Sequence, residues 1–271
     1  MWQLYPIQRP VQLIGLYTAF EQQFPADYIF RGETHDFYEL VLVLNGSLGV
    51  TAGAQPILLE APAAILHPPM QFHSLRAAQG SCPHVIVFSF SVHSFPAFEK
   101  YIFAIDDHQI ARAKQVLALL QKDKGRLFPG SPIQGEERNV QQALLELEIL
   151  LLTLSGSGDA FSQKESSAGA RNYRFAVQVI EENLSAPLDT PTLAHLTHMS
   201  PSLLKKTFSR HAGVGVMEYV RTRKIHAAIP LLREGLSVQE IATRLGFSNA
   251  GYFSTVFHRI TGHTPGYYRN H

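Results

Sequence analysis

The sequence has almost no cysteine: among its 271 residues only Cys82 carries a thiol. An internal disulfide framework is excluded, because each bridge needs two cysteines. Long apolar runs are missing as well, since Ile149 to Leu154, the longest, is far shorter than the about 20 residues of a membrane-spanning helix. The first residues, Met1 to Pro6, lack the basic and then apolar pattern of a secretory signal. We therefore expect a cytoplasmic protein that does not enter a membrane.

Net charge is also small, at +1, but it is unevenly distributed. Residues 171–271 hold 12 Lys and Arg against 6 Asp and Glu, a balance of +6, whereas residues 1–170 hold 11 basic and 16 acidic residues, a balance of −5. A basic segment suits a polyanion, and an acidic segment does not. With 45% hydrophobic and 17% charged residues, the chain has the composition of a globular protein with room for two domains. The two halves are therefore predicted to be separate domains with different partners.

A run rich in serine and glycine, over residues 155–170, is typical of a linker between the halves. Before it, short segments rich in β-branched and aromatic residues alternate with turn signals. Strands are expected at residues 12–20, 27–32, 37–44, 48–51, 56–59, 63–67 and 84–90. The dipeptide Asn45-Gly46 predicts a hairpin between residues 37–44 and 48–51, because it tolerates the positive φ angles of a type I′ turn. Many short strands in succession favour a β-sandwich or barrel.

Two helices are expected after the strands, at residues 106–120 and 136–154. The second carries an apolar heptad seam at Val140, Leu144, Leu147, Leu151 and Leu154. Two alternatives are open: the seam packs on its own domain, or it pairs with a second chain. Apolar residues on further faces favour a partner, namely Ala143, Leu145, Ile149, Leu150 and Leu152. Dimerisation through the seam is therefore a hypothesis.

Residues 171–271 are predicted to be helical, with helices at 173–183, 190–197, 201–211, 216–233, 238–245, 250–260 and 265–269. Pro230 is awkward inside the fourth of these helices, because an interior proline deletes a hydrogen bond and clashes with the carbonyl four residues back. The sequence therefore predicts a kink near His226 or a helix end near Ile229.

The most specific motif of the chain extends from Ile241 to Phe257. Ala242 is small where two helices cross closely, Gly246 suits a turn with positive φ, and Ser248 or Asn249 can cap the next helix. Together with residues 261–265 and 267–269, this pattern resembles the C-terminal signature of the AraC/XylS family of bacterial transcription regulators. The resemblance is strong over residues 171–271 and looser over the remainder of the chain, and it implies two successive helix-turn-helix units.

The first unit is expected to carry most of the sequence preference. Ser200 is a good N-cap and Pro201 fits the first helical position, while His198 stands where the second unit has Gly246 and must accept strain or another turn. The resemblance places Ser202, Lys205 and Lys206 at positions that contact bases and Arg210 at a phosphate contact. The alternative is an ordinary solvated face. From the second unit, weaker contacts are expected from Asn249, Ser254, Thr255 and His258.

Residues 32–39, followed by Gly46, resemble the first cupin motif, in which two histidines and a glutamate line a β-barrel. His35, Glu39 and Gly46 fall in place, but Phe37 occupies the second histidine position. His73 matches the second cupin motif loosely. His35, Glu39 and His73 are three candidate ligands for Fe, Mn or Zn.

Because one ligand position is lost, we favour direct recognition of an organic effector over a metal site. No metal ligand and no cofactor are expected. Such a pocket is mostly apolar with a few placed polar groups. The expected effector-binding side chains are Glu33, His35, Tyr38, Glu39, His67, His73 and Arg76.

These features predict an α+β protein of two domains. A cupin-like β-barrel followed by two helices, over residues 1–154, binds the effector and dimerises, residues 155–170 form a linker, and residues 171–271 form an all-α DNA-binding domain with two helix-turn-helix units. The resemblance implies a non-enzymatic, sequence-specific regulator, more often an activator, that binds double-stranded DNA, a small effector such as a sugar or organic acid, RNA polymerase and a second copy of itself. Two alternatives are a metal-dependent cupin enzyme with an accessory DNA-binding domain and a constitutive DNA-binding protein whose barrel only dimerises.

Overall fold

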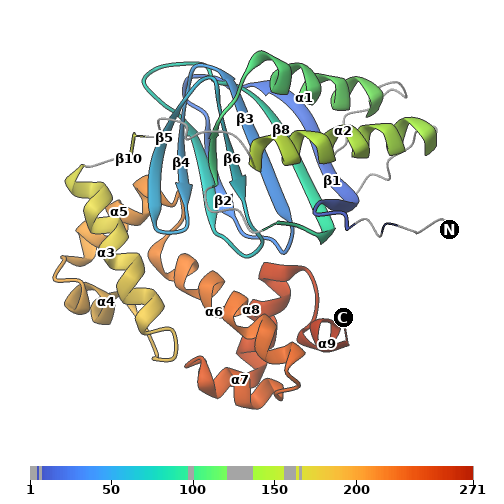
Figure 1. The fold of residues 1–271 in the computed structure, drawn as a ribbon. Helices are drawn as coiled ribbons and strands as arrows, with labels where there is room; N and C mark the ends of the chain where they lie inside the picture. Colours follow the sequence, from blue (N-terminus) through green and yellow to red (C-terminus); the bar gives the residue numbers. More distant parts are fainter. Residues whose placement is uncertain are drawn as a thin grey trace.

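The computed structural model describes residue 5 and residues 8–96, 101–120, 137–155, 163–164 and 167–270. Its first part is built on strands, and its second part is helical (Figure 1). The strands are β1 (Gln12–Gln23), β2 (Ile29–Glu33), β3 (Tyr38–Asn45), β4 (Ser47–Ala52), β5 (Gln55–Glu60), β6 (Ala63–His67), β7 (His73–Ala77), β8 (His84–Ser94), β9 (Ile102–Ala104) and β10 (Gln163–Lys164). The helices are α1 (Asp107–Leu120), α2 (Glu137–Ser155), α3 (Ala168–Glu182), α4 (Thr190–Leu196), α5 (Pro201–His211), α6 (Val216–Arg233), α7 (Val238–Arg244), α8 (Ala250–Thr261) and α9 (Pro265–Asn270).

The strands form two five-stranded sheets that face one another (Figure 1). The first has the order β1-β8-β3-β6-β9 and the second has the order β10-β5-β4-β7-β2, with antiparallel neighbours throughout. This two-layer arrangement is the jelly-roll form of the predicted cupin-like barrel. Every predicted strand is present, but β7, β9 and β10 were not predicted. Polar residues interrupt the apolar pattern of β7, β9 has three residues, and β10 lies within the expected linker.

The predicted hairpin at Asn45-Gly46 is wrong, because β3 and β4 belong to different sheets. Both edges of β3 are already occupied by β6 and β8, so the chain must leave that sheet. Gly46 makes the corner with φ +79°, and a Cβ there would lie 3.1 Å from Cα of Pro83. The adjacent hairpin is instead formed by β4 and β5, where Ala52 faces Gln55.

Alternation along β3 explains the layers of the N-terminal part. Leu40 and Leu42 are fully buried on the outer face of the first sheet, where α1 and α2 cover it, whereas Val41 and Val43 are buried between the two sheets. Successive side chains of a strand point to opposite faces, so each face of this strand carries its own core. Glu148 of α2 is a buried carboxylate, and the backbone N–H of Leu13 donates a hydrogen bond to its Oε1 atom at 2.9 Å.

The heptad seam of α2 packs on its own domain. Leu147 and Leu151 have no exposed surface and lie in one core with α1 and the first sheet. The first alternative is therefore confirmed, and dimerisation through this seam is wrong. A separate face of the same helix is exposed, with Leu145 at 45%, Ile149 at 41% and Leu152 at 40%.

The predicted helices of the C-terminal part are all present, and the bounds of α5 and α6 agree with the prediction. The predicted end near Ile229 is wrong, since α6 continues to Arg233. Pro230 lies in the last turn, where its missing N–H removes one hydrogen bond, while its own carbonyl still accepts from the N–H of Glu234 at 2.9 Å. His198 accepts the left-handed conformation, with φ +54°.

Helices α3 and α5 lie beside the second sheet, and α6 lies below the ends of the strands (Figure 1). Phe72, from the loop before β7, packs in one core with residues of α3, α5 and α6. Thr51 of β4 and Ser74 of β7 both donate hydroxyl hydrogen bonds to the carbonyl of His211, at the end of α5. The hydroxyl of Tyr173 on α3 donates to the carbonyl of Gly53 at 3.2 Å. These contacts fix the helical part on the sheets.

Truncation of Leu147 tests the packing of α2. Leu147→Ala removes a fully buried side chain, so the free energy of unfolding should fall by about 2.7–5 kcal/mol. Leu145→Ala is the control on the exposed face of the same helix and should change it by less than about 0.5 kcal/mol. Urea unfolding of the full chain measures both, and equal losses would contradict the assignment of the two faces.

Candidate functional site

The first helix-turn-helix unit is formed by α4 and α5. The side chain of Asp189 caps α4 by accepting from the N–H of Thr192 at 2.8 Å, and the hydroxyl of Ser200 caps α5 by accepting from the N–H of Leu203 at 3.1 Å. Such caps stabilise the first turns of short helices, where backbone N–H groups lack intrahelical partners. Both helices are therefore fixed at their N-terminal ends, and for α5 this end meets the turn between them.

The outer face of α5 carries the predicted DNA-contacting residues. Ser202, Lys205, Lys206 and Arg210 are all exposed, while Leu204, on the opposite face, is fully buried. Spacings of three and four residues place the four polar side chains on one helix face. Two lysines and an arginine beside a hydroxyl provide both charge for phosphates and hydrogen bonds for base edges.

The second unit is formed by α7 and α8, and its polar groups are less available. The Oδ1 atom of Asn249 accepts from the N–H of Tyr252 at 2.8 Å as the cap of α8. The hydroxyls of Ser254 and Thr255 donate to backbone carbonyls of their own helix, at 2.9 and 3.1 Å. Thr255 and His258 are exposed, whereas Ser254 is half-buried. These hydrogen bonds reduce the donors that the second unit can offer to DNA.

Lys224 of α6 joins the two units. It is 5% exposed, and its Nζ donates to the carbonyl of Ala186, before α4, at 2.6 Å and to that of Leu245, at the end of α7, at 2.7 Å. Gly246 follows with φ +64°, and a Cβ there would lie 2.8 Å from the carbonyl carbon of Ala186. Burial lowers the pKa of the Lys224 ammonium, and its two carbonyl acceptors satisfy two of its three N–H groups. No sequence motif identified this role.

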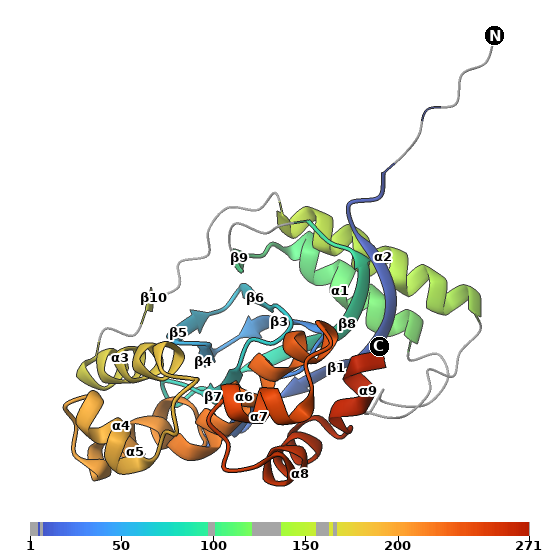
Figure 2. The same cartoon turned by 90° about the horizontal axis from the view of Figure 1, so that it is seen from below.

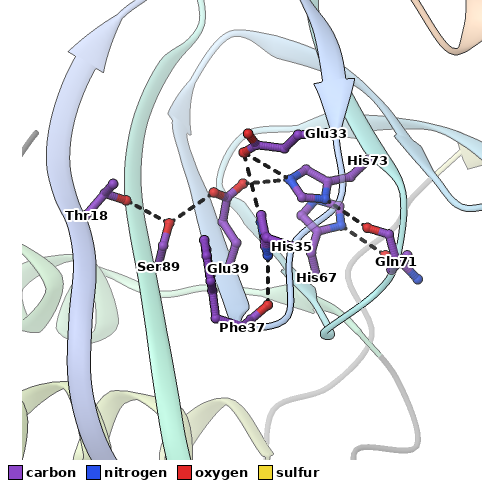
Figure 3. A network of polar contacts seen from close by, with 9 residues as sticks. All are labelled: Thr18, Glu33, His35, Phe37, Glu39, His67, Gln71, His73 and Ser89. Carbon is purple, nitrogen blue, oxygen red and sulfur yellow. Dashed lines mark hydrogen bonds and ion pairs between the residues drawn. The ribbon is translucent and has the colours of Figure 1, made fainter. Parts of the chain in front are cut away.

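A second cluster of functional groups lies between the sheets (Figure 3). It consists of Glu33 from the end of β2, His35 from the next turn, Glu39 from β3 and His73 from β7. One nitrogen or oxygen of each side chain lies within 4.8 Å of those of the other three. Sequence reasoning expected these four residues at one effector site, and the structure brings them together.

The distances in the cluster are short. His73 Nε2 lies 3.3 Å from Glu39 Oε1 and 3.8 Å from Glu33 Oε1, and His35 Nε2 lies 3.9 Å from the same Glu33 oxygen. Glu39 is further fixed by the hydroxyl of Ser89, which donates to its Oε2 at 3.1 Å. His73 has no exposed side-chain surface, whereas Glu33 is 48% exposed at the mouth of the cluster.

Hydrogen bonds orient the histidine rings (Figure 3). His35 Nδ1 lies 2.9 Å from the carbonyl of Phe37, and His73 Nδ1 lies 3.2 Å from the carbonyl of Gln71. His67, whose ring stacks on that of His73 at 4.3 Å, has Nδ1 3.0 Å from the side-chain oxygen of Gln71. A carbonyl only accepts, so the Nδ1 atom of each ring carries a proton. Gln71 was not predicted as part of the site, because it matches no motif.

Burial and charge set the protonation of the cluster. Burial favours neutral Glu39, but hydrogen bonding and charge from His73 outweigh it and lower the pKa of Glu39 to about 2. Burial also disfavours the charged form of His73, yet Glu39 raises its pKa above the ordinary value. Burial, reinforced by the positive charge of His73, lowers the pKa of His35 to about 4 and that of His67 to about 3. At neutral pH, Glu39 is therefore ionised and the imidazoles of His35 and His67 are neutral, while the carboxylate of Glu39 favours the charged form of His73.

The structure does not bring Tyr38 and Arg76 to this cluster. Tyr38 alternates with Glu39 along β3, so its ring packs on the other face of the sheet, with Phe90 at 5.9 Å. Arg76 lies on the outer face of the second sheet, over Gly49, where a Cβ would be 2.4 Å from its Nη1. Period-two alternation, which separates both residues from the cluster, depends on strand register that the motif alone does not define.

A cleft with a volume of about 490 Å³ opens at Glu33. Its lining comes from both parts of the chain: Glu33 from β2 and Thr34 from the turn after it, and Glu218, Arg221, Thr222, Arg259 and Ile260 from α6 and α8. The cluster is therefore accessible from the junction between the sheets and the helix-turn-helix units.

Two family models match the chain. Residues 16–160 match the AraC-like ligand binding domain, and residues 193–271 match a helix-turn-helix domain. The fold and the exposed face of α5 are those of a two-domain helix-turn-helix protein. Because the first match covers more than half of the chain, the protein belongs to the AraC family of transcription regulators.

Curated relatives match part of the chain. YpdC of Escherichia coli, described as an uncharacterized HTH-type transcriptional regulator, is 37% identical over 97 residues, which cover 35% of this chain and 34% of the relative. The bifunctional transcriptional activator/DNA repair enzyme AdaA of Bacillus subtilis is 33% identical over 34% of this chain and 44% of its own. The XylDLEGF operon transcriptional activator of Pseudomonas putida is 34% identical over 42% and 36%. The chain thus spans about a third to under half of the length of these relatives.

Among solved structures, ToxT from Vibrio cholerae aligns with 97% of this chain and 98% of its own, at 15% identity and a TM-score of 0.38. A regulator with an AraC-type DNA-binding domain from Chromobacterium violaceum aligns with 38% of this chain and 95% of its own, at 26% identity and a TM-score of 0.36. Among the described helices, none is long and apolar enough to cross a membrane.

Substitution of Lys224 tests its role as the connection between the two units. Lys224→Met keeps the apolar stem but leaves the carbonyls of Ala186 and Leu245 without their donor, so the free energy of unfolding should fall by at least about 1 kcal/mol. Lys205→Met, on the exposed face of α5, is the control and should change it by less than about 0.5 kcal/mol. Both are measured by urea unfolding without DNA, and a Lys224 variant as stable as the control would contradict the role.

Proposed function

We propose that the protein is a cytoplasmic, sequence-specific DNA-binding transcription regulator whose N-terminal domain senses an effector, and that it is not an enzyme. The observation that carries the proposal is the exposed face of α5, with Ser202, Lys205, Lys206 and Arg210, in a domain of two helix-turn-helix units. Membership of the AraC family supports the same function. Relatives described as transcriptional activators favour activation over repression, and an activator requires contact with RNA polymerase.

The two units are suited to one stretch of double-stranded DNA. Lys224 ties both to α6, so they form one body rather than two independent modules. Recognition helices connected in this way engage successive major-groove faces, about one helical turn apart. We infer that α5 supplies most of the base contacts and that α8 supplies weaker ones through Asn249, Ser254, Thr255 and His258, because three of these side chains already hydrogen bond within the second unit.

Lys206→Ala tests DNA contact by α5. On a preferred site selected by the full-length protein from a random pool, the variant should lose about 1–3 kcal/mol of binding free energy and relax the preference at one position. If the variant loses affinity equally for all sequences, Lys206 contacts a phosphate instead. The slope of log affinity against log salt should then correspond to about one phosphate contact fewer. Lys114→Ala, an exposed lysine on α1, is the control and should bind as the unmodified protein does.

If Lys206→Ala and the control bind all sites equally well, α5 does not face DNA. A full-length protein that selects no sequence from the random pool, and whose weak binding ignores salt, would contradict the proposed function as a whole, because phosphate contacts make affinity salt-dependent.

We further propose that the protein is a homodimer and that the exposed face of α2 forms the interface. Leu145 and Ile149 lie four residues apart, so they share one side of the helix, and both are more than two-fifths exposed. Large apolar side chains grouped on one helix face favour a partner with the same face, as symmetric dimers provide. The heptad seam of α2 is buried in the core of its own domain, so the exposed face is the part of this helix that remains available for a second copy.

Leu145→Glu combined with Ile149→Glu should convert the dimer to folded monomers, because it places charges on the exposed face without touching the core. Sedimentation velocity measures the mass, and far-ultraviolet circular dichroism reports the fold. A monomeric unmodified protein would contradict the dimer, and a variant that remains dimeric would place the interface elsewhere.

A further inference from the structure

The polar cluster contains more potential metal ligands than the cupin motif predicts. Phe37 occupies the second histidine position, and its ring stacks on that of His35 at 3.8 Å. Glu33, at the end of β2, brings a carboxylate to the same point, so the cluster has four candidate donors: Glu33, His35, Glu39 and His73. The sequence favoured an organic effector over a metal ion because Phe37 replaces one histidine ligand. Glu33 supplies a fourth donor in its place, so the number of donors no longer disfavours a metal ion.

The histidine rings are oriented as metal ligands are. The Nδ1 atoms of His35 and His73 donate to backbone carbonyls, which leaves Nε2 of each ring for the centre of the cluster. Within the described part of the chain, the buried Nε2 atom of His35 makes no hydrogen bond, and the buried Nε2 atom of His73 faces Glu39 Oε1 at 3.3 Å. Metal-binding histidines nearly always donate their second ring N–H to a carbonyl or carboxylate, which fixes the tautomer and the ring orientation.

The distances also fit one ion. Ligand atoms about 2.1 Å from a single ion lie about 3.0–3.5 Å apart along the edges of an octahedral or tetrahedral site. His73 Nε2 and Glu39 Oε1 are 3.3 Å apart, and Glu33 Oε1 is 3.8 Å from His73 Nε2 and 3.9 Å from His35 Nε2. All four donor atoms lie within 4.8 Å of one another, so side chains must rotate to bring them to one ion, and half-exposed Glu33 has the most room to do so.

We propose that Glu33, His35, Glu39 and His73 form a binding site for one divalent transition-metal ion, with zinc as the best match. Two imidazoles disfavour Mg²⁺ and Ca²⁺, which prefer oxygen ligands only. Four protein ligands complete a tetrahedral zinc site, whereas catalytic zinc sites keep a position open for water or substrate. The donor set therefore fits a sensory or structural ion rather than a catalytic one.

The loop of residues 68–72 connects this site with the DNA-binding part. The N–H of Met70 donates to the carbonyl of His35 at 2.7 Å, and the carbonyl of Met70 accepts from Nη1 of Arg223 on α6 at 3.2 Å. Arg223 is also held by Glu181 of α3 at 2.6 and 3.1 Å. An ion that fixes His35 and His73 also fixes this loop, so its binding should alter the position of α6. This second step, in which the ion is the effector, rests on the proposed function.

The site is tested by loading the full-length protein with zinc. After dialysis, elemental analysis should give one zinc per chain, and Co²⁺ in its place should show the intense visible absorption of a tetrahedral site. Glu33→Gln retains the shape of a half-exposed side chain and should abolish both signals without unfolding the protein. His84→Gln is the matched control, because His84 pairs with Glu21 at 3.0 Å outside the cluster and should leave one zinc per chain.

Substoichiometric zinc in the unmodified protein, or one zinc per chain in folded Glu33→Gln, would overturn the metal site and leave a buried ion pair. The effector step is measured separately, as DNA affinity on the selected site with zinc and with chelator. It requires at least a fivefold difference in the unmodified protein and none in Glu33→Gln. An unchanged affinity in the zinc-loaded protein would overturn that step. Absence of DNA binding in every condition would contradict the proposed function, while the zinc measurement still decides the site.

Discussion

The docking of residues 68–72 between the two parts of the chain is the contact on which the rest of the structure depends. Phe72 is 3% exposed and lies in one core with Tyr173, Phe208 and Tyr219, although it belongs to the β-sheet part. Met70, with φ +66°, packs against the core of the second helix-turn-helix unit. Burial of one phenylalanine contributes about 1.5–3 kcal/mol, so this loop links the stability of both units to the sheets.

The same loop carries the hydrogen bonds that orient His67 and His73, because Gln71 lies between the two apolar anchors. Burying charge is costly unless each charge is paired, and here Glu39, His73 and their neighbours come from separate strands. The cluster is therefore assembled only when both sheets face one another and the loop is docked. Figure 2 shows the strands between the pair α1 and α2 on one side and the C-terminal helices on the other. Any ligand that stabilises the cluster acts on the same contacts that hold α3 and α6.

Elements with strong local signals could be predicted from the sequence, and those that depend on pairing could not. Proline at the first helical position and a serine cap defined α5 correctly. Asn45-Gly46 has a local preference for a hairpin, but occupied edges on both sides of β3 override it. Glu33, His35, Glu39 and His73 were all candidates by residue type. The exclusion of Tyr38 and Arg76 required the strand register, and the role of Glu33 as a fourth donor required the spatial approach of β2 to β7.

The turns of the two helix-turn-helix units both contain a residue in the left-handed conformation, but the residue differs: it is His198 in the first unit and Gly246 in the second. Gly246 is required where the second turn meets the backbone of Ala186, since a Cβ would lie 2.8 Å from its carbonyl carbon. The first turn has His198 in the same left-handed region, which an L-residue adopts at a cost of about 1–2 kcal/mol. The tighter junction fixes α7 and α8 to α6, whereas α5 contacts the sheets through His211. The second unit also has a direct contact with the β-sheet part, because Met70 packs against its core. A change at the sheets can therefore reach both units directly, α5 through the carbonyl of His211 and the second unit through Met70.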